Sequence, residues 1–218
     1  MRGGFASSSS RVAIAAMVSL AAMAYFVVAV AVLHVLRADL DPTRRFLSQY
    51  ALGPHGWLMA TAFLSIGVAC AALAFGLRRA GPRSGFATGG VVALAVAAGG
   101  VTLAAAFPMD APGSPATRTG TIHVIDAQLN FTSLAVAALC FSVAFRRDER
   151  WRGRFRASLG LGLALVVSFA IMMTATGGYG LINRAMAGLI VAWLVTTARA
   201  LREVTAGNGS GDPPLSGG

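Results

Sequence analysis

The sequence carries little charge, and its positive charge comes from one residue type. Only 12% of its 218 residues are charged, whereas soluble globular domains carry about 25%. Lysine is absent, so the 18 basic residues are all arginine, and they face only 8 acidic residues. This deficit argues against a soluble domain and indicates that lipid is the solvent for most of the chain.

Cysteine and catalytic motifs are also scarce. The two cysteines, Cys70 and Cys140, both lie inside apolar runs. The chain therefore has neither a disulfide framework nor the CxxC spacing of a metal site. A Walker loop, a GxSxG nucleophile elbow, an HExxH zinc motif and a glycine-rich dinucleotide-binding fingerprint are all missing. The sequence identifies no cofactor.

The main feature of the sequence is instead a series of long apolar runs. A helix needs about 20 apolar residues to cross a hydrocarbon core roughly 30 Å thick, and proline and glycine mark the gaps where such helices stop. Six segments meet this length, and we expect helices at 12–36, 57–77, 86–107, 124–145, 157–177 and 181–200. The predicted fold is an all-α integral membrane bundle of six transmembrane helices.

The predicted organisation is one membrane domain, 12–200, with two short flanks. Residues 1–11 form a cytoplasmic segment, and 201–218, rich in glycine, proline and serine, form a disordered cytoplasmic tail. The first apolar run is longer than the about 7 to 15 residues of a signal-peptide core. We therefore expect it to be retained as the first span.

The arginines alternate between the two predicted membrane faces in unequal numbers. One face carries thirteen: Arg2, Arg11, Arg78, Arg79, Arg83, Arg146, Arg147, Arg150, Arg152, Arg154, Arg156, Arg199 and Arg202. The other carries five: Arg37, Arg44, Arg45, Arg118 and Arg184. Arginine-rich loops stay in the cytoplasm, which predicts a cell-membrane protein with both termini cytoplasmic. Short clusters between spans orient helices rather than track a phosphate backbone, so a nucleic-acid partner is not expected despite the net charge of +10.

Unusual polar residues gather at the outer ends of the predicted spans. In a six-helix bundle with short connections these ends lie close together, which predicts a polar pocket at the extracytoplasmic face. The candidate pocket residues are Ser48, Tyr50, His55, Asp110, His123, Asp126, Asn130 and Arg184.

His123, Asp126 and Asn130 have i, i+3 and i+7 spacing, so they share one face of the fourth predicted helix. Polar groups facing lipid are costly, so this face should point into the bundle. An alternative is that Asp126 complements the helix N-terminus while His123 lies at the water interface. A metal or acid–base site would need ligands or proton-transfer groups, and the residues available for this are His55, Asp110, His123 and Asp126.

Arg184 is the one outer arginine that lies within a predicted span. A charge at this depth is costly unless it reaches the headgroups or pairs with an acid. We expect it to pair with Asp126 or Asp110, the alternative being contact with lipid headgroups.

Several outer motifs resemble those of a known family. They are Leu47-Ser48-Gln49-Tyr50, Gly53-Pro54-His55-Gly56-Trp57, Phe107-Pro108-Met109-Asp110, Gly120-Thr121-Ile122-His123 and Gly180-Leu181-Ile182-Asn183-Arg184. In order and spacing the sequence resembles the bacterial and archaeal domain-of-unknown-function 998 family, from about residue 15 to 200. The resemblance implies a six-span membrane protein without an established activity. It also implies that Ser48, Asp110, His123 and Arg184 form one constellation.

Three functions fit these patterns. The first is a non-enzymatic membrane protein whose outer pocket binds or moves a lipid or small molecule, and we favour it because no complete catalytic set is visible. The second is a membrane-embedded hydrolase or transferase, with or without a metal, that uses His123 with Asp110 and Asp126. The third is a scaffold or assembly subunit. Membrane lipids are the expected partners, and the sequence does not indicate an oligomeric state.

The predicted orientation can be tested by cysteine labelling from outside the cell. A Ser114→Cys variant should react with an impermeant thiol reagent, and a Ser84→Cys variant should not, because the arginine distribution places these positions on opposite faces. The reverse labelling pattern would overturn the orientation.

Overall fold

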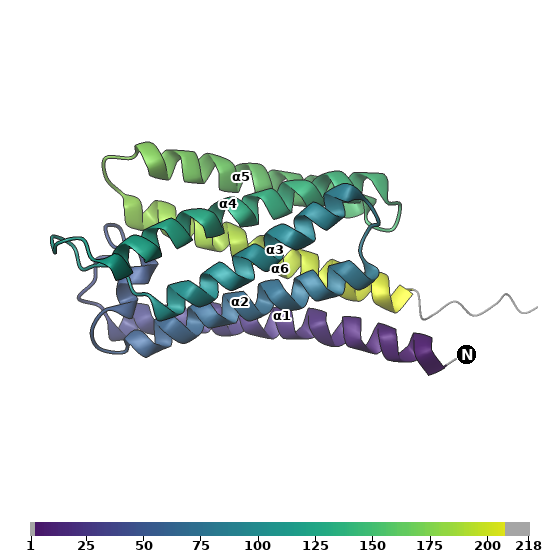
Figure 1. Ribbon diagram of the computed structural model, residues 1–218, viewed down its shortest axis with the longest axis horizontal. Helices are drawn as coiled ribbons and strands as arrows, with labels where there is room; N and C mark the ends of the chain where they lie inside the picture. Colours follow the sequence, from purple (N-terminus) through teal and green to yellow (C-terminus); the bar gives the residue numbers. More distant parts are fainter. Residues whose placement is uncertain (1–2, 208–218) are drawn as a thin grey trace, which may run out of the picture.

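A computed structural model describes the backbone of residues 3–207 and the side chains of residues 9–207 (Figure 1). Arg2 and the segment 208–218, most of the predicted tail, lie outside the described residues. The helices are α1 (Gly3–Leu36), α2 (Gly56–Ala80), α3 (Gly85–Ala106), α4 (Arg118–Arg147), α5 (Phe155–Thr174) and α6 (Tyr179–Gly207), with 3-10 helices η1 (Leu47–Ala51) and η2 (Arg152–Arg154).

The prediction of six apolar helices is confirmed. All six are long and apolar enough to span a membrane, and the described residues contain no strand. The chain is thus an integral, multi-pass membrane protein. Three helices extend six or more residues beyond the predicted apolar segments at one end: α1 begins at Gly3, α4 begins at Arg118, and α6 continues to Gly207. α4 starts early because the Thr117 hydroxyl accepts a hydrogen bond from the Gly120 N–H (3.0 Å) and caps the helix before the apolar run begins.

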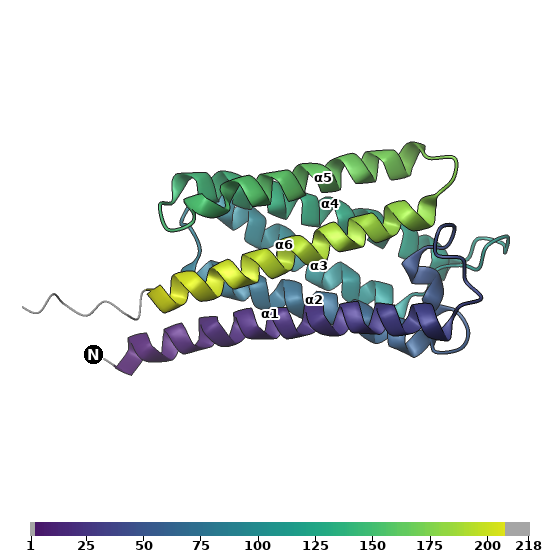
Figure 2. The same cartoon turned by 180° about the vertical axis from the view of Figure 1, so that it is seen from behind.

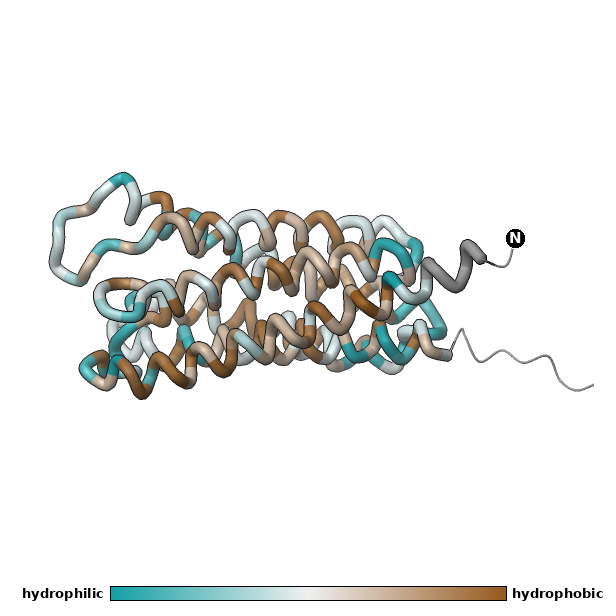
Figure 3. Tube along the Cα trace, turned by 90° about the horizontal axis from the view of Figure 1, so that it is seen from below, coloured by the Kyte–Doolittle hydropathy of each residue, from teal (hydrophilic) through white to brown (hydrophobic). Residues whose placement is uncertain are grey.

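Each helix packs against the next one along the chain, and α6 also packs against α1 and α2. The start of α1, the end of α6 and the α2–α3 and α4–α5 turns lie at one end of the bundle, called here the terminal end (Figures 1 and 2). The α1–α2 connection, the α3–α4 loop and the α5–α6 turn form the opposite, loop end. Hydrophilic residues gather at both ends and hydrophobic residues along the middle (Figure 3), as a bilayer requires.

The terminal end is tightly packed around aromatic and small side chains. Trp151 is fully buried and stacks on Phe145, with ring centroids 4.8 Å apart. Phe141 contacts both Phe145 and Trp193, at 5.6 Å and 6.3 Å between centroids. Gly90 fits directly against the Phe141 ring, which leaves no room for a Cβ. Close approach of this kind supplies the van der Waals contact that holds membrane helices together.

Helix α5 is buried against the bundle mainly in its terminal-end half. The Ser158 hydroxyl donates to the Ala138 carbonyl of α4 (2.9 Å) and accepts from the Trp193 indole N–H of α6 (2.9 Å). One turn further, Gly162 packs against Ala138. Beyond Leu165 no α5 residue is buried. The loop-end half of α5 therefore covers the bundle without packing closely into it.

Candidate functional site

The α1–α2 connection folds over the loop end and binds to the start of α6. The Gly180 N–H donates to the Thr43 carbonyl (3.1 Å), and the Leu47 N–H donates to the Asn183 side-chain oxygen (2.9 Å). A Cβ at Gly180 would collide with the Pro42 and Arg45 carbonyls, so this approach requires glycine. These contacts hold η1, with Ser48 and Tyr50, against the bundle.

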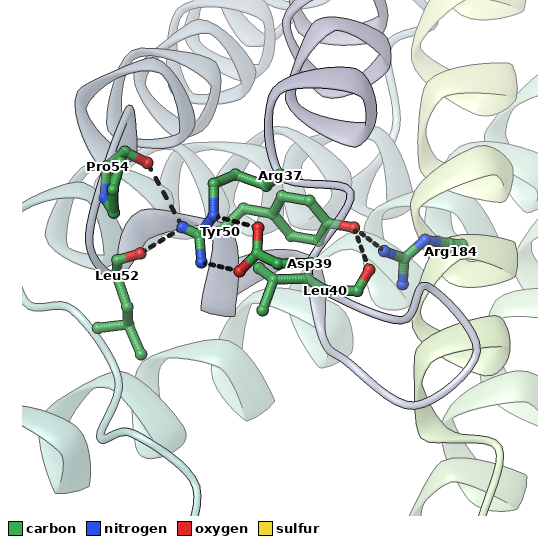
Figure 4. A network of polar contacts seen from close by, with 7 residues as sticks. All are labelled: Arg37, Asp39, Leu40, Tyr50, Leu52, Pro54 and Arg184. Atoms are coloured by element: carbon green, nitrogen blue, oxygen red, sulfur yellow. Dashed lines mark hydrogen bonds and ion pairs between the residues drawn. The ribbon is translucent and has the colours of Figure 1, made fainter.

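Arg184 is the centre of this attachment. Its Nε–H donates to His34 Nε2 (2.9 Å), one terminal nitrogen donates to the Arg45 and Gly180 carbonyls (2.7 and 3.1 Å), and the other donates to the Tyr50 hydroxyl (3.1 Å). The guanidinium also lies 5.6 Å from the centre of the Tyr50 ring. Figure 4 shows Arg184 and the Leu40 carbonyl meeting at the Tyr50 hydroxyl. Four hydrogen bonds to uncharged acceptors thus satisfy the guanidinium.

His34 must be neutral to take part in this network. Its Nδ1 lies 2.7 Å from the Val30 carbonyl, an acceptor that requires a hydrogen on Nδ1. Its Nε2 receives the Arg184 Nε–H and can do so only without a hydrogen of its own. Sequence patterns gave no sign of this role, because His34 has no polar neighbour at helical spacing on α1.

The predicted pairing of Arg184 with Asp126 or Asp110 is wrong. Asp110 accepts from the Thr117 N–H (2.9 Å) and hydroxyl (2.6 Å), and Asp126 bonds to Asn130. The Thr117 hydrogen bonds hold the pKa of the Asp110 carboxyl below its usual range. The prediction failed because backbone carbonyls and neutral side chains of the folded α1–α2 connection replaced a counter-ion.

Arg37 makes a second attachment that the sequence interpretation missed. Its guanidinium forms a two-pronged ion pair with Asp39 (2.9 Å for both bonds) and donates to the Leu52 carbonyl (2.6 Å; Figure 4). The hydrogen bond from Arg37 keeps the pKa of the Asp39 carboxyl below its usual range. The connection is therefore tied to the bundle by one arginine at each side.

The predicted inward face of α4 is confirmed. His123, Asp126 and Asn130 are only 5%, 5% and 7% exposed. The Asn130 amide donates to Asp126 Oδ2 (3.0 Å), and His123 Nδ1 lies 2.8 Å from the Phe107 carbonyl. The remaining oxygens, Asp126 Oδ1 and Asn130 Oδ1, are buried without a partner among the described residues and face Gly100 of α3.

The four residues that could have shared a metal do not come together. His55 is exposed at the start of α2, in a left-handed backbone conformation (φ 62°) without a side-chain capping bond. Across residues 9–207, no three His, Cys, Asp or Glu side chains form a group that could hold a metal ion. The convergence of His55, Asp110, His123 and Asp126 that the metal alternative would require is thus not seen among the described residues.

The loop-end half instead contains a mainly apolar, partly open cavity of about 290 Å³, near the lower end of the ~300–1,000 Å³ range of small-molecule sites. All six helices contribute to it. Its apolar lining includes Phe63, Val101, Phe131, Leu134, Phe169 and Ile190. The polar lining consists of Ser48, His123, Gln128, Asn130, Tyr179 and Asn183.

The candidate residues therefore divide into two groups. Ser48, His123 and Asn130 line the cavity, and the Ser48 hydroxyl donates to the Met109 sulfur (3.0 Å). The others, Tyr50, His55, Asp110, Asp126 and Arg184, are absent from the lining. No polar motif could have revealed the cavity, because most of its wall is apolar.

Comparison with known proteins agrees with the resemblance seen in the sequence. A family model described as "Protein of unknown function (DUF998)" matches residues 19–200, a range that reaches from α1 to α6. Neither the curated proteins nor the solved structures contain a match to the chain.

Replacing Arg184 should loosen the α1–α2 connection. Arg184→Met removes four hydrogen bonds and should lower the free energy of unfolding in mixed micelles by about 3 kcal/mol. Each hydrogen bond to a charged group contributes about 1.5–3 kcal/mol, but the total loss is smaller than the sum because some of the freed partners bond to water instead. Arg44→Met is the matched control, since the Arg44 side chain is 84% exposed and should change stability by less than about 0.5 kcal/mol.

Double-mutant cycles distinguish the observed partner of Arg184, Tyr50, from the predicted partner, Asp126. Arg184→Met combined with Tyr50→Phe should be non-additive by about 0.5 kcal/mol or more. Combined with Asp126→Asn it should be additive. Coupling to Asp126 without coupling to Tyr50 would contradict the observed network.

Adjacent glycines of α3 test the packing of the Asp126–Asn130 pair. A Cβ at Gly100 would lie 2.6 Å from Asp126 Oδ1 and 2.7 Å from Asn130 Oδ1, whereas one at Gly99 meets nothing within 4 Å. Gly100→Ala should therefore destabilise the protein by about 1–3 kcal/mol, and Gly99→Ala should be neutral or slightly stabilising. Equal effects in chemical unfolding would show that α4 does not pack here as described.

Proposed function

The chain belongs to the DUF998 family of proteins of unknown function, and we propose that it binds an amphipathic, lipid-like molecule in its loop-end cavity. The observation that carries this proposal is the cavity itself: its wall is mostly apolar, with hydrogen-bonding side chains from η1, α4 and α6. Ligand sites for small apolar molecules have this composition, in which apolar surface gives affinity and a few polar groups fix orientation.

The loose half of α5 supports entry from the hydrocarbon region. Phe169, Met172 and Met173 of α5 line the cavity, yet none of them is buried. Across from them, Phe131 of α4 contacts Phe169 with ring centroids 6.1 Å apart. Separating this aromatic contact would widen the space between α4 and α5, so an acyl chain could enter without passing through water.

The polar lining supports a ligand whose head donates hydrogen bonds. His123 Nδ1 faces the Phe107 carbonyl and so carries a hydrogen, which leaves Nε2 as an acceptor in the neutral ring. Asn130 also lines the cavity, but its Oδ1 is buried against Gly100, so His123 Nε2 is the acceptor that a ligand would meet. An acceptor beside an apolar cavity suits a hydroxyl, amide or ammonium head rather than a carboxylate.

We further propose that the loop end faces the outside of the cell membrane and that both termini are cytoplasmic. The unequal arginine distribution supports this orientation. In that orientation the cavity lies at the depth of the outer leaflet, and its ligand would come from that leaflet.

Filling the cavity should abolish binding. Ala127 and Ala187 line it, so the Ala127→Phe/Ala187→Phe double variant should occupy the space needed by an acyl chain. The assay is cross-linking of a diazirine-bearing monoacylglycerol to purified protein in detergent, with the labelled peptides mapped by mass spectrometry. Labelling of α4, α5 and α6 should fall severalfold in this variant.

Ala170→Phe is the matched control, because Ala170 is exposed on α5 and does not line the cavity. It should label like the wild type. His123→Phe keeps a ring but removes the acceptor, and should weaken labelling by the hydroxyl probe more than by its methyl-ether analogue. Wild-type labelling of the filled variant would reject the cavity as the site and would favour a scaffold role instead.

A further inference from the structure

The α4–α5 turn lies at the terminal end of the bundle, opposite the loop-end cavity (Figure 2), and it is rich in arginine. The segment from Arg146 to Arg156 carries six arginines and two acidic residues. Two of the arginines are neutralised: Arg150 pairs with Asp148 (2.9 Å), and Arg154 pairs with Glu203 of α6. The other four form no ion pair with any described residue. They are Arg146, Arg147, Arg152 and Arg156.

The turn that carries these arginines is held rigidly. Trp151, in the middle of the turn, is fully buried and stacks on Phe145 nearly in parallel (interplanar angle 8°). The turn is further joined to α6 by the Arg154–Glu203 pair. The unpaired arginines thus extend from a fixed frame, which lowers the entropy lost when they bind an anion.

Two adjoining hollows lie between the end of α4 and the start of α5, and both are lined by Arg146 and Phe155. The first, of about 760 Å³, is otherwise lined by Arg152, Gly153 and Arg156. The second, of about 580 Å³, is lined by Arg147 together with Ser142, Val143 and Leu159. The Arg146 guanidinium lies 5.6 Å from the centre of the Phe155 ring, at the boundary between the two hollows.

The charged and apolar linings are arranged along the membrane normal. α4 runs toward the terminal end, so Val143 lies roughly one helical turn (~5 Å) deeper than Arg146. α5 runs away from it, so Leu159 lies about one turn deeper than Phe155. Moving inward from the end of the bundle, a layer of arginines is therefore followed by an apolar layer, the same order as the phosphate and acyl chains of a phospholipid.

We propose that these hollows form a binding site for an anionic phospholipid, with its phosphate held by Arg146, Arg152 and Arg156 and an acyl chain lying along Val143 and Leu159. Guanidinium groups bind phosphate oxygens with paired hydrogen bonds. Basic pockets between membrane helices suit such headgroups. The positive end of the α5 helix dipole lies at the same turn. The net positive charge selects an anionic lipid over a zwitterionic one.

The test is a titration of delipidated protein in a neutral detergent with phosphatidylglycerol, read by native mass spectrometry. Arg146→Gln/Arg152→Gln/Arg156→Gln should bind it roughly 100-fold more weakly than the wild type, since each arginine near a headgroup contributes on the order of tenfold or somewhat less. The matched control is Arg78→Gln/Arg79→Gln/Arg83→Gln, which removes the same charge from the α2–α3 turn at the same end of the bundle. It should bind close to the wild-type affinity. An equal loss in both variants would mean diffuse charge attraction and would overturn the site.

Two further measurements identify the lipid, and the retention of phosphate binding in the first shows that the variant is still folded. Leu159→Trp fills the apolar hollow without changing charge, so it should weaken phosphatidylglycerol binding and leave weak inorganic phosphate binding unchanged. Phosphatidylcholine should bind more weakly than phosphatidylglycerol. Inorganic phosphate that displaces the lipid at equal concentration, or phosphatidylcholine that binds equally well, would overturn the assignment to an anionic phospholipid.

Discussion

The Ser158 hydroxyl is the interaction on which the shape of the bundle depends. It accepts from Trp193 of α6 and donates to the Ala138 carbonyl of α4, so one side chain joins three helices. Together with the contact at Gly162 it fixes α5 at the terminal end. A straight helix fixed at one end can diverge at the other, and the cavity lies where α5 has lost close contact with its neighbours. The packing that closes one end of the bundle thus leaves a cavity at the other end.

Arginine side chains have opposite roles at the two ends of the bundle. At the loop end, Arg37 and Arg184 are fully engaged with carbonyls, neutral side chains and Asp39, so they order the α1–α2 connection. At the terminal end, Arg146, Arg152 and Arg156 have no ion-pair partner among the described residues and extend from a rigid turn. The first arrangement shapes an uncharged cavity, and the second presents positive charge to the membrane surface.

Local properties of the sequence predicted most of the fold but little of the site. Apolar length placed the six helices, and the spacing of His123, Asp126 and Asn130 predicted their inward face, because both depend on neighbouring residues alone. The partner of Arg184 could not be predicted in this way, since His34 is 150 residues away and meets it only after α1 and α6 pack. A pocket was expected at this end, but its apolar wall escaped prediction because Phe131 and Phe169 have the same sequence pattern whether they face lipid or a ligand.

The proposed ligand of the loop-end cavity would lie with its chain between α4, α5 and α6. An experimental density map of protein extracted from its own membrane in mild detergent tests this directly. Elongated density should lie beside Phe131, Phe169 and Ile190, with its wider end near His123 and Asn130. A map in which α5 packs closely against α6 and side chains fill the cavity would contradict the proposal.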